Sequence, residues 1–536
     1  MSMENVEISM NTTEYNPVLE ENAELKKEVE TLKLEKEELA AKLAWYEEQF
    51  RLSVAQRYGP SSEKMPIDGQ ESFFNEAEKE QRPLLPEPDL EEITYKRSKA
   101  RKPTGERFSD LPVETIEYEL LDGSLECEEC GATLTKMSKE TRKELVVIPA
   151  TVKLVEHVQH IYTCVNCRDN GIAGNIKMAR APEPVIPHSF VSPSLLAYIM
   201  DRKYAQALPL YRQEKQWEYL GIALSRQNMA NWIIKGSELL KPLYLLLKSF
   251  LLKETYIHAD ESEFQVLSEP GKKPSSKSYM WLYCTGERAP PIYLYEYQAS
   301  RSGTHPQKFL TGFSGIIQTD GYEAYNKVEC ALRMGCLSHF QRHFVDALKA
   351  LPKDADVSRS LAEAGRRYCS RLFMLERKFK DMPPEERYLA RLKESKPLLD
   401  EFHSWLAEGD KKALPKSALG KAIKYCLKQW EHLTVFLTDG NVEISNNRAE
   451  RALKSFVIGR KNYLFAKCPA GASASAVCYS IIETARANGL SPLNYLTHLF
   501  EMLPNLPLND PEAINKLLPW SGELPKSCYV KPKILD

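Results

Sequence analysis

Two cysteine pairs constrain this chain more than any other feature of its sequence. Each pair has the spacing Cys-x-x-Cys, and 33 residues separate the two pairs, which are Cys127 with Cys130 and Cys164 with Cys167. Each pair can place two thiolates on one ion, and two pairs complete a tetrahedral four-cysteine site for structural Zn²⁺. Strand-like residues at 144–148 and 152–158 lie between the pairs. The spacing therefore predicts a four-cysteine zinc ribbon within residues 111–180, with a redox pair as the alternative.

Apolar residues repeat every seven positions early in the sequence, at Leu25, Leu32, Leu39 and Tyr46. Asn22 and Lys36 interrupt the apolar seam, and polar residues at such positions lower stability but fix register and oligomer state. The pattern predicts a coiled coil over residues 18–58 that joins two copies of the chain as a homodimer. The alternative is a single amphipathic helix packed on its own chain. Residues 1–17 lack the repeat, and we expect a disordered tail there.

Charge is distributed unevenly along the chain, although 72 basic and 74 acidic residues give a net charge of only −2. Residues 59–110 combine prolines and acidic residues without an apolar period, which is typical of a linker. Within it, six basic residues and one acidic residue lie between Lys96 and Arg107. We interpret this run as a basic arm, with a solvated linker as the alternative. The arm residues expected to contact DNA phosphates are Lys99, Arg101 and Lys102.

No stretch of the sequence has the length and apolar character of a membrane span. The longest candidate, residues 239–252, contains Lys241 and Lys248, whereas a spanning helix needs about 18 uninterrupted apolar residues. The first residues also lack the basic and apolar segments of a secretory signal. We therefore expect a cytoplasmic protein without a membrane partner and without disulfides.

A helical segment interrupted by a turn follows the cysteine-rich region. Residues 204–220 have a helical pattern that ends at a glycine, and Ser225 is placed to cap a second helix. This order is typical of a helix-turn-helix unit, so we predict a helix-turn-helix-like domain over residues 181–252, with an ordinary helical hairpin as the alternative. The residues at the start of the second helix that could read base edges or phosphates are Arg226, Gln227 and Asn228.

The hydrophobic pattern changes to an alternating period within residues 253–345. Three segments, 255–267, 278–285 and 291–297, are rich in β-branched and aromatic residues and predict three successive strands. Asp260 lies inside the first of them. A carboxylate avoids such an apolar setting unless it is paired or bound to a cation.

A second carboxylate, Asp320, ends a fourth apolar run that follows a short helical segment at 306–311. At a strand end before a glycine, its side chain can face a cleft. Two carboxylates on neighbouring strands suit a divalent cation.

A charge-rich helical region over residues 346–440 precedes the third candidate acid. In the following segment, 441–490, Ser445 is placed to cap a helix and Glu450 lies one turn inside it, with Glu443 as its rival. Hard ions such as Mg²⁺ take oxygen ligands and leave positions for phosphate, so Asp, Asp and Glu from separate segments are suitable ligands. The basic residues that would attract a DNA backbone there are Arg448, Arg451, Lys454, Arg460 and Lys461.

Several short motifs together carry a family resemblance. They are His258-Ala-Asp-Glu-Ser262, Gln318-Thr-Asp-Gly-Tyr322, Gly335-Cys-Leu-Ser-His339, Asn446-Asn-Arg-Ala-Glu-Arg451, Ile458-Gly-Arg-Lys-Asn-Tyr-Leu-Phe465, Tyr58-Gly-Pro-Ser-Ser-Glu-Lys64, Ile482-Glu-Thr-Ala485, Asn488-Gly489, Leu518-Pro-Trp520 and the paired cysteines. With these motifs the chain resembles, nearly end to end, the large transposase C protein of insertion-sequence-66 transposases. The first motif has Asp-Glu-Ser where Asp-Asp/Glu-Thr is usual, which leaves Asp260 intact.

The resemblance implies a multidomain α/β protein with a ribonuclease H-like catalytic core interrupted by the helical insertion, and a C-terminal segment over residues 491–536. It also implies an Asp-Asp-Glu triad, carried onto Asp260, Asp320 and Glu450, that binds two Mg²⁺ ions, with Mn²⁺ as a substitute. Cys336 and His339 match a pair beside the core in such enzymes, and we expect them to support the site. With His343 they also have metal-ligand spacing, which is the alternative.

The implied function is that of a DNA transposase of an insertion sequence, which binds terminal inverted repeats and catalyses strand cleavage and strand transfer. The resemblance also suggests small helper proteins encoded by the same element. It further implies association with the bacterial nucleoid when the protein is bound to DNA. Two other classes remain open. A zinc-dependent DNA-binding regulator would bind without cutting, and a host nuclease or resolvase on the same core would cut unrelated or branched DNA.

Overall fold

The computed structural model describes residues 25–26, 28–33, 36, 43, 152–158, 161–163, 176–178, 181–352, 355–507 and 510–530. The chain divides into two units, one of residues 1–61 and 182–530 and the other of residues 62–181 and 531–536. In the second unit, β1 (Ile161–Thr163) and β2 (Ile176–Met178) form an antiparallel pair. The four predicted zinc ligands and the arm residues Lys99, Arg101 and Lys102 lie outside the described residues.

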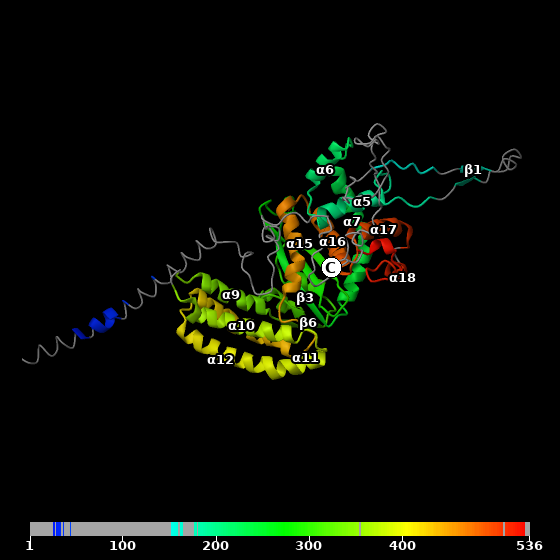
Figure 1. Cartoon of the computed structure of the whole chain (residues 1–536). Coiled ribbons are helices and arrows are strands. Elements are labelled where there is room, and N and C mark those ends of the chain that lie inside the picture. The colour runs from blue at the N-terminus through cyan, green and yellow to red at the C-terminus, as the bar shows by residue number, and fades with distance from the viewer. Residues whose placement is uncertain are drawn as a thin grey trace, which may run out of the picture. The chain divides into compact units, whose positions relative to one another are not determined.

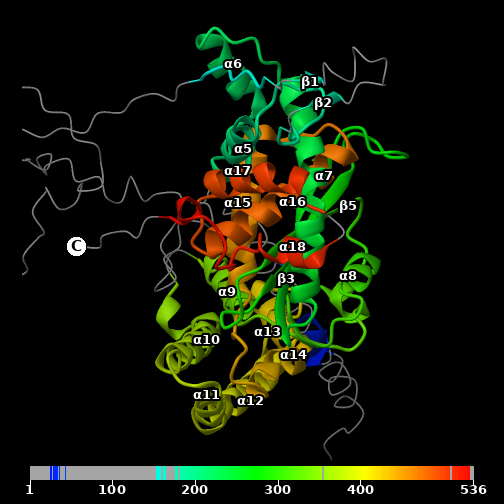
Figure 2. The ribbon, with the colours of Figure 1, turned by 90° about the vertical axis from the view of Figure 1, so that its right-hand side faces the viewer.

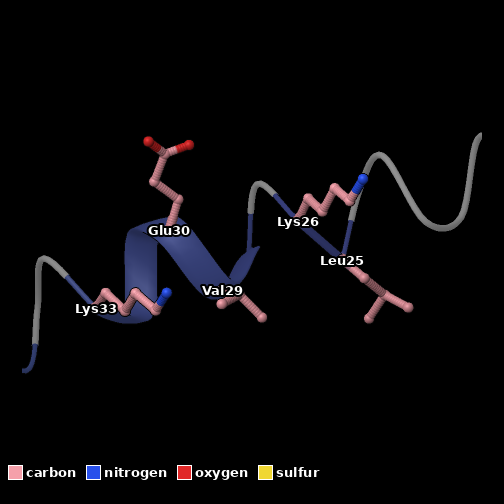
Figure 3. A pocket seen from close by; sticks show the side chains of 5 residues that line it. All are labelled: Leu25, Lys26, Val29, Glu30 and Lys33. Carbon is pink, nitrogen blue, oxygen red and sulfur yellow. The ribbon is translucent and has the colours of Figure 1, made fainter.

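The described residues of the predicted coiled coil are helical. Leu25, Val29 and Leu32 are each about half exposed, at 51%, 50% and 55%. Figure 3 shows the side chains of Leu25 and Val29 pointing away from that of Glu30. The helix is therefore amphipathic, and its apolar side has little cover within one copy of the chain.

A mixed sheet organises the larger unit. Its strands are β3 (Tyr256–Val266), β4 (Lys277–Thr285), β5 (Tyr293–Gln298), β6 (Gly315–Gln318), β7 (Ala331–Met334) and β8 (Phe465–Ala466). The order is β5-β4-β3-β6-β7, and β8 pairs with the far end of β3. β3, β4 and β5 are antiparallel, whereas β6 and β7 run parallel to β3. The three-strand meander predicted from the sequence is confirmed, and β3 is the central strand of the whole sheet.

Helices connect the strands of the parallel half of the sheet, and one helix covers its antiparallel edge. α8 (Thr304–Phe309) lies between β5 and β6, and the short 3₁₀ helix η4 (Glu323–Lys327) lies between β6 and β7. α16 (Pro469–Ala487) runs beside β5 and α7 (Arg226–Leu251) (Figure 2). Hydroxyls of α16 accept the N–H groups of the edge strand, because Ser480 Oγ bonds Tyr295 N at 2.7 Å and Thr484 Oγ1 bonds Tyr293 N at 3.0 Å. These bonds satisfy an edge that another strand could otherwise extend.

The predicted helix-turn-helix-like region contains α5 (Pro193–Met200), α6 (Leu210–Tyr219) and α7. The turn after α6 places Gly221 at φ +74°, a conformation that glycine adopts without strain. Ser225 caps α7 as expected, because its Oγ accepts the N–H of Asn228 at 3.2 Å. The exposed first turn of α7 carries Arg226, Gln227 and Asn228. Its other end is core, where the fully buried leucines are Leu240, Leu243, Leu247 and Leu251.

The helical insertion has a hydrophobic core of its own. Its helices are α9 (Leu337–Lys349), α10 (Leu361–Lys378), α11 (Pro384–Ala390), α12 (Lys396–Lys412), α13 (Ala418–Lys428) and α14 (Trp430–Thr434), several of which are labelled in Figure 1. Phe344, Leu372 and Phe402 are buried together there. α9 starts before residue 346 and packs on α10 and α13, so it belongs by contact to the insertion while it directly follows β7.

A fully buried arginine ties this insertion to the segment that returns to the sheet. Arg391 bonds both oxygens of Glu376, at 2.8 and 2.7 Å, and donates to the Val442 carbonyl at 2.8 Å. Burial alone would raise the pKa of Glu376, but Arg391 and Arg387 lower it overall. The returning chain is thus fixed shortly before α15 (Asn447–Tyr463), which is followed by α16, α17 (Pro492–Met502) and α18 (Pro511–Asn515).

In the part of the chain that the structure describes, no helix has the length and apolar character needed to cross a membrane.

Removal of Arg391 should destabilise the fold strongly, because it leaves Glu376 as an under-compensated buried charge and several carbonyls without a donor. We expect Arg391→Leu to lower the free energy of unfolding by about 3 kcal/mol, measured by urea denaturation. The control is Arg367→Ala, which removes a half-exposed partner of Glu363 and should cost less than about 1 kcal/mol. Equal losses in the two variants would contradict this account.

Candidate active site

The register of two parallel strands brings the first two acids to equivalent positions. His258 of β3 lies opposite Gln318 of β6, which is the last residue of that strand. Asp260 and Asp320 each lie two residues further along. β6 ends there while β3 continues, so the side of β3 next to Asp260 lacks a strand partner until β8 pairs at Gln265. Asp260 and Asp320 are both partly exposed beside this gap in the sheet.

Glu450 approaches this gap from the first turn of α15, which runs alongside β3 (Figure 1). A hollow of about 280 Å³ joins the strand to the helix. The residues that line it are Asp260, Glu261, Ser262, His339, Arg342, Glu450, Leu453, Lys454 and Val457. Asp320 and Glu450 both lie close enough to Asp260 to raise the pKa of its carboxyl group. All three predicted acids therefore belong to one electrostatic cluster.

The electrostatics of this cluster favour a bound cation. Burial raises the pKa of Asp260 well above its usual value. The carboxylates that raise the pKa further are those of Glu261, Asp320 and Glu450. Like charges in a half-buried site are stabilised together by a divalent ion, and the all-oxygen donor set suits Mg²⁺ or Mn²⁺. The residues present therefore fit the hard divalent ion expected from the sequence.

One asparagine fastens α15 to β3 next to the acids. Asn446 is fully buried, and its side-chain Nδ2 donates to the carbonyl of Ala259 at 2.9 Å. Its Oδ1 lies 3.0 Å from Nδ1 of His258. Its backbone N–H donates to Sγ of Cys336 at 3.1 Å, at the start of α9. Asn446 therefore links the strand that carries Asp260, the helix that carries Glu450 and the helix that follows β7.

The cap of α15 differs from the sequence-based expectation. Ser445 was placed to cap the helix, but the N-cap residue is Asn446 and its side chain makes no capping bond. The side chain bonds β3 instead, so tertiary contacts replace the local cap.

Glu443, the rival of Glu450, is engaged in a different ion pair. Its Oε1 lies 2.8 Å from Nε of Arg448 and 3.6 Å from Nε2 of His258. Burial would raise the pKa of Glu443, but His258 and Arg448 lower it to about 2. Its N–H also donates to the hydroxyl of Tyr256 at 2.9 Å. Glu443 thus holds the base of α15, whereas Glu450 lines the hollow with Asp260.

Side chains of α9 surround Glu450. Nη2 of Arg342 lies 3.2 Å from Oε2 of Glu450, and Nδ1 of His339 lies 3.8 Å from Oε1. Burial lowers the pKa of His339. His343, the possible third ligand beside Cys336 and His339, instead packs its ring 4.1 Å from that of Tyr425. Sequence reasoning missed Arg342, although it lies one helical turn after His339 and so on the same face.

A second missed residue is Glu261, the neighbour of Asp260. Arg301 Nε donates to Glu261 Oε1 at 2.8 Å, and the hydroxyl of Tyr325 donates to Oε2 at 2.5 Å. Burial raises the pKa of Glu261, and these donors oppose that rise. With its oxygens occupied, Glu261 supports the strand beside Asp260. The alternating strand pattern alone does not reveal these partners, which come from distant segments.

The basic residues predicted to contact DNA fall into two groups on α15. Arg451, Lys454 and Lys461 are exposed and follow one face of the helix. Arg448 pairs with Glu443, and Nη1 of Arg460 contacts the carbonyl of Glu263 and Oγ of Ser262. The exposed residues are positioned to contact a phosphate backbone. Arg448 and Arg460 instead hold α15 against β3.

Comparison with protein families gives four matches along the chain. A family described as "Transposase IS66 family" matches residues 188–474, and "IS66 C-terminal element" matches residues 480–520. The "zinc-finger binding domain of transposase IS66" matches residues 124–168, which include all four cysteines of the two pairs. A fourth family, "Transposase C of IS166 homeodomain", matches residues 45–116.

Three similar proteins come from Sinorhizobium fredii (strain NBRC 101917 / NGR234). The uncharacterized protein y4hP is 31% identical over 74% of this chain and 73% of its own length. The uncharacterized protein y4jD is 30% identical over 79% of this chain and 83% of its own length. The uncharacterized protein y4qI is 29% identical over 88% of both chains. The similarity therefore extends well beyond the sheet and its acids.

Loss of the Asn446 side chain should loosen the contact between α15 and β3. Asn446→Ala leaves the Ala259 carbonyl and a ring nitrogen of buried His258 without their partner. We expect the free energy of unfolding to fall by about 1–3 kcal/mol, measured by urea denaturation. Asn441→Ala is the matched control, because that side chain is exposed and, among the described residues, donates to the nearby Asp439 alone. A loss no greater than in the control would show that Asn446 does not fasten the helix.

Proposed function

Because the chain belongs to the IS66 transposase family, we propose that it is the DNA transposase of an insertion sequence, with Asp260, Asp320 and Glu450 as its catalytic triad. The observation that carries this proposal is the convergence of three acids from β3, the end of β6 and the first turn of α15. The helical insertion separates Asp320 from Glu450 in the sequence, and the three acids come together beside one gap in the sheet.

The proposal includes a ribonuclease H-like core. Support comes from the mixed sheet, in which an antiparallel meander continues into two strands parallel to β3. The first acid lies on the central strand and the second follows its parallel neighbour. The insertion between the second and third acids agrees with the arrangement that the family resemblance implies.

The chemistry follows from the positions of the acids. Two Mg²⁺ ions, bound by the triad, would activate a water or a terminal 3′-hydroxyl and stabilise the leaving oxygen during in-line attack on a phosphodiester. Asp260, Asp320 and Glu450 would hold these ions, while Asn446 and Glu443 keep α15 at its distance from β3. Cleavage at the element ends and transfer into target DNA would use the same carboxylates in succession.

The proposed DNA path runs along basic residues beside the acids. The exposed side chains of Arg451, Lys454 and Lys461 would neutralise the backbone next to the hollow, and Arg448 and Arg460 would keep α15 in place behind them. The exposed start of α7, with Arg226, Gln227 and Asn228, would contact the terminal inverted repeats. The zinc finger, held by its four cysteines, and the basic arm with Lys99, Arg101 and Lys102 would add contacts to the same DNA.

We further propose that the N-terminal helix joins two copies of the chain. The half-exposed apolar side of that helix, with Leu25, Val29 and Leu32, is what a coiled-coil partner would cover. Two joined copies could hold two element ends together.

The direct test is cleavage of labelled DNA that carries the element's own terminal repeats, in the presence of Mg²⁺ and any helper proteins of the element. Wild-type protein should cut at the repeat boundary, and Asp320→Ala should reduce the rate by at least about a thousandfold, because a ligand of the reacting centre is lost. Asp346→Ala is the control, since the side chain of Asp346 on α9 is about half exposed and forms its ion pair with Lys349 among the described residues.

The outcome distinguishes the remaining classes of protein. Binding of the repeats without cleavage by the wild type would indicate a DNA-binding regulator. Cleavage of branched or unrelated DNA with no preference for the repeats would indicate a nuclease or resolvase. Cleavage by Asp320→Ala at the wild-type rate would remove this acid from the proposed triad.

Mg²⁺ binding should strengthen as pH rises. The raised pKa of Asp260 means that the metal-free site retains a proton to higher pH than an ordinary aspartate, and Mg²⁺ must displace it. Affinity should therefore fall by up to about tenfold per pH unit as the pH drops through the pKa of the cluster. Isothermal titration calorimetry in buffers of different ionisation enthalpy measures both the affinity and the released proton. A pH-independent affinity without proton release would contradict this expectation.

A further inference from the structure

A second set of metal-ligand atoms lies on the α9 side of Glu450. Sγ of Cys336, a ring nitrogen of His339 and a carboxylate oxygen of Glu450 all lie within 4.8 Å of one another. Cys336 is the N-cap residue of α9 and His339 lies in the first turn, so the Cys-x-x-His spacing puts both on one side of the helix. Glu450 faces them from the first turn of α15. Among the described residues, these three side chains form the one group of at least three histidine, cysteine or acidic ligands that lie close enough to share an ion.

Two atoms of this set are buried polar atoms that lack a hydrogen-bond partner among the described residues. They are Nδ1 of His339 and Oε1 of Glu450. They lie 3.8 Å apart, which is too long for a hydrogen bond between them. Ligand atoms on one tetrahedral ion, each about 2.0–2.3 Å from it, are separated by roughly 3–4 Å. A shared cation would therefore satisfy both atoms.

The neighbouring groups leave these atoms available. Arg342 contacts Glu450 through Oε2 at 3.2 Å, which is the other carboxylate oxygen, and its Nη1 lies 3.4 Å from Nε2 of His339. Metal binding at Nδ1 would place the ring proton on Nε2, so the guanidinium of Arg342, which is also a donor, would turn away from the ring. Its side chain is 55% exposed. Sγ of Cys336 is buried and accepts the backbone N–H of Asn446 at 3.1 Å. Such a bond to sulfur is typical of the outer contacts that orient a metal-bound thiolate.

We propose that Cys336, His339 and Glu450 bind one transition-metal ion of the zinc class, in addition to the Mg²⁺ proposed for the triad. Thiolate, imidazole and carboxylate together suit Zn²⁺ and similar borderline ions, whereas Mg²⁺ prefers oxygen ligands alone. Three protein ligands leave a fourth position for water. The ion would also orient Glu450 for its role in the triad, and this consequence rests on the proposed function. The metal site itself does not, because it is defined by its three ligand atoms.

Metal content of the purified full-length protein tests the proposal. Transition metals per chain are measured by inductively coupled plasma mass spectrometry for the wild type, His339→Ala and Cys336→Ser. Each variant should hold one ion fewer per chain than the wild type, while the zinc finger keeps its own ion. Cys426→Ser is the control for loss of a buried thiol, because Cys426 lies in the core of the insertion. Arg342→Ala is the control on α9, because it removes a neighbour of Glu450 without removing a proposed ligand. Both controls should retain the wild-type content.

Co²⁺ substitution gives a second measurement that does not depend on a change in metal count. The wild-type protein should show a thiolate-to-cobalt absorption band that weakens in Cys336→Ser, while circular dichroism shows that this variant is folded. A wild-type metal content in folded His339→Ala would overturn the proposal. Asp320→Ala separates the two proposals, since it should lose DNA cleavage and keep the full transition-metal content.

Discussion

The buried side chain of Asn446 is the contact on which the arrangement of the acids depends. It bonds the backbone of β3 one residue before Asp260, and it begins the helix whose first turn carries Glu450. Each atom of its amide has a partner in the core, Ala259 on one side and His258 on the other. Because an unpaired buried amide costs about 1–3 kcal/mol, the helix has one favourable position against the strand.

The rest of the larger unit supports that position from both ends of α15. At the start, Glu443 pairs with Arg448, and Arg391 fixes the returning segment through the carbonyl of Val442. Towards the end, Arg460 contacts the backbone of β3 at Glu263. The insertion therefore does more than separate two acids in sequence, since its buried arginine determines where the chain re-enters the sheet. The family matches span the sheet, the insertion and α15, in accord with one integrated structure.

The sequence predicted what depends on local patterns. The alternation of apolar residues located β3, β4 and β5, and an apolar run that ends before a glycine located Asp320. Ser225 was predicted as a helix cap because capping acts over three residues. Contacts across long separations could not be predicted, as with Asn446 and His258, which are 188 positions apart. For the same reason the local pattern predicted Ser445 as the cap of α15, and it left Glu443 as a rival of Glu450 for the third acid. The zinc ribbon and the basic arm remain predictions, because their residues lie outside the described part of the chain.

We propose that Asp260, Asp320 and Glu450 bind the two Mg²⁺ ions, and that Glu443 does not. Iron-directed cleavage of the protein backbone tests this claim most directly: Fe²⁺ replaces Mg²⁺, and ascorbate with peroxide generates hydroxyl radicals that cut the chain beside the bound ion. We predict cuts near residues 260, 320 and 450, which excess Mg²⁺ suppresses. Cuts centred on residue 443, or none that Mg²⁺ suppresses, would contradict this claim.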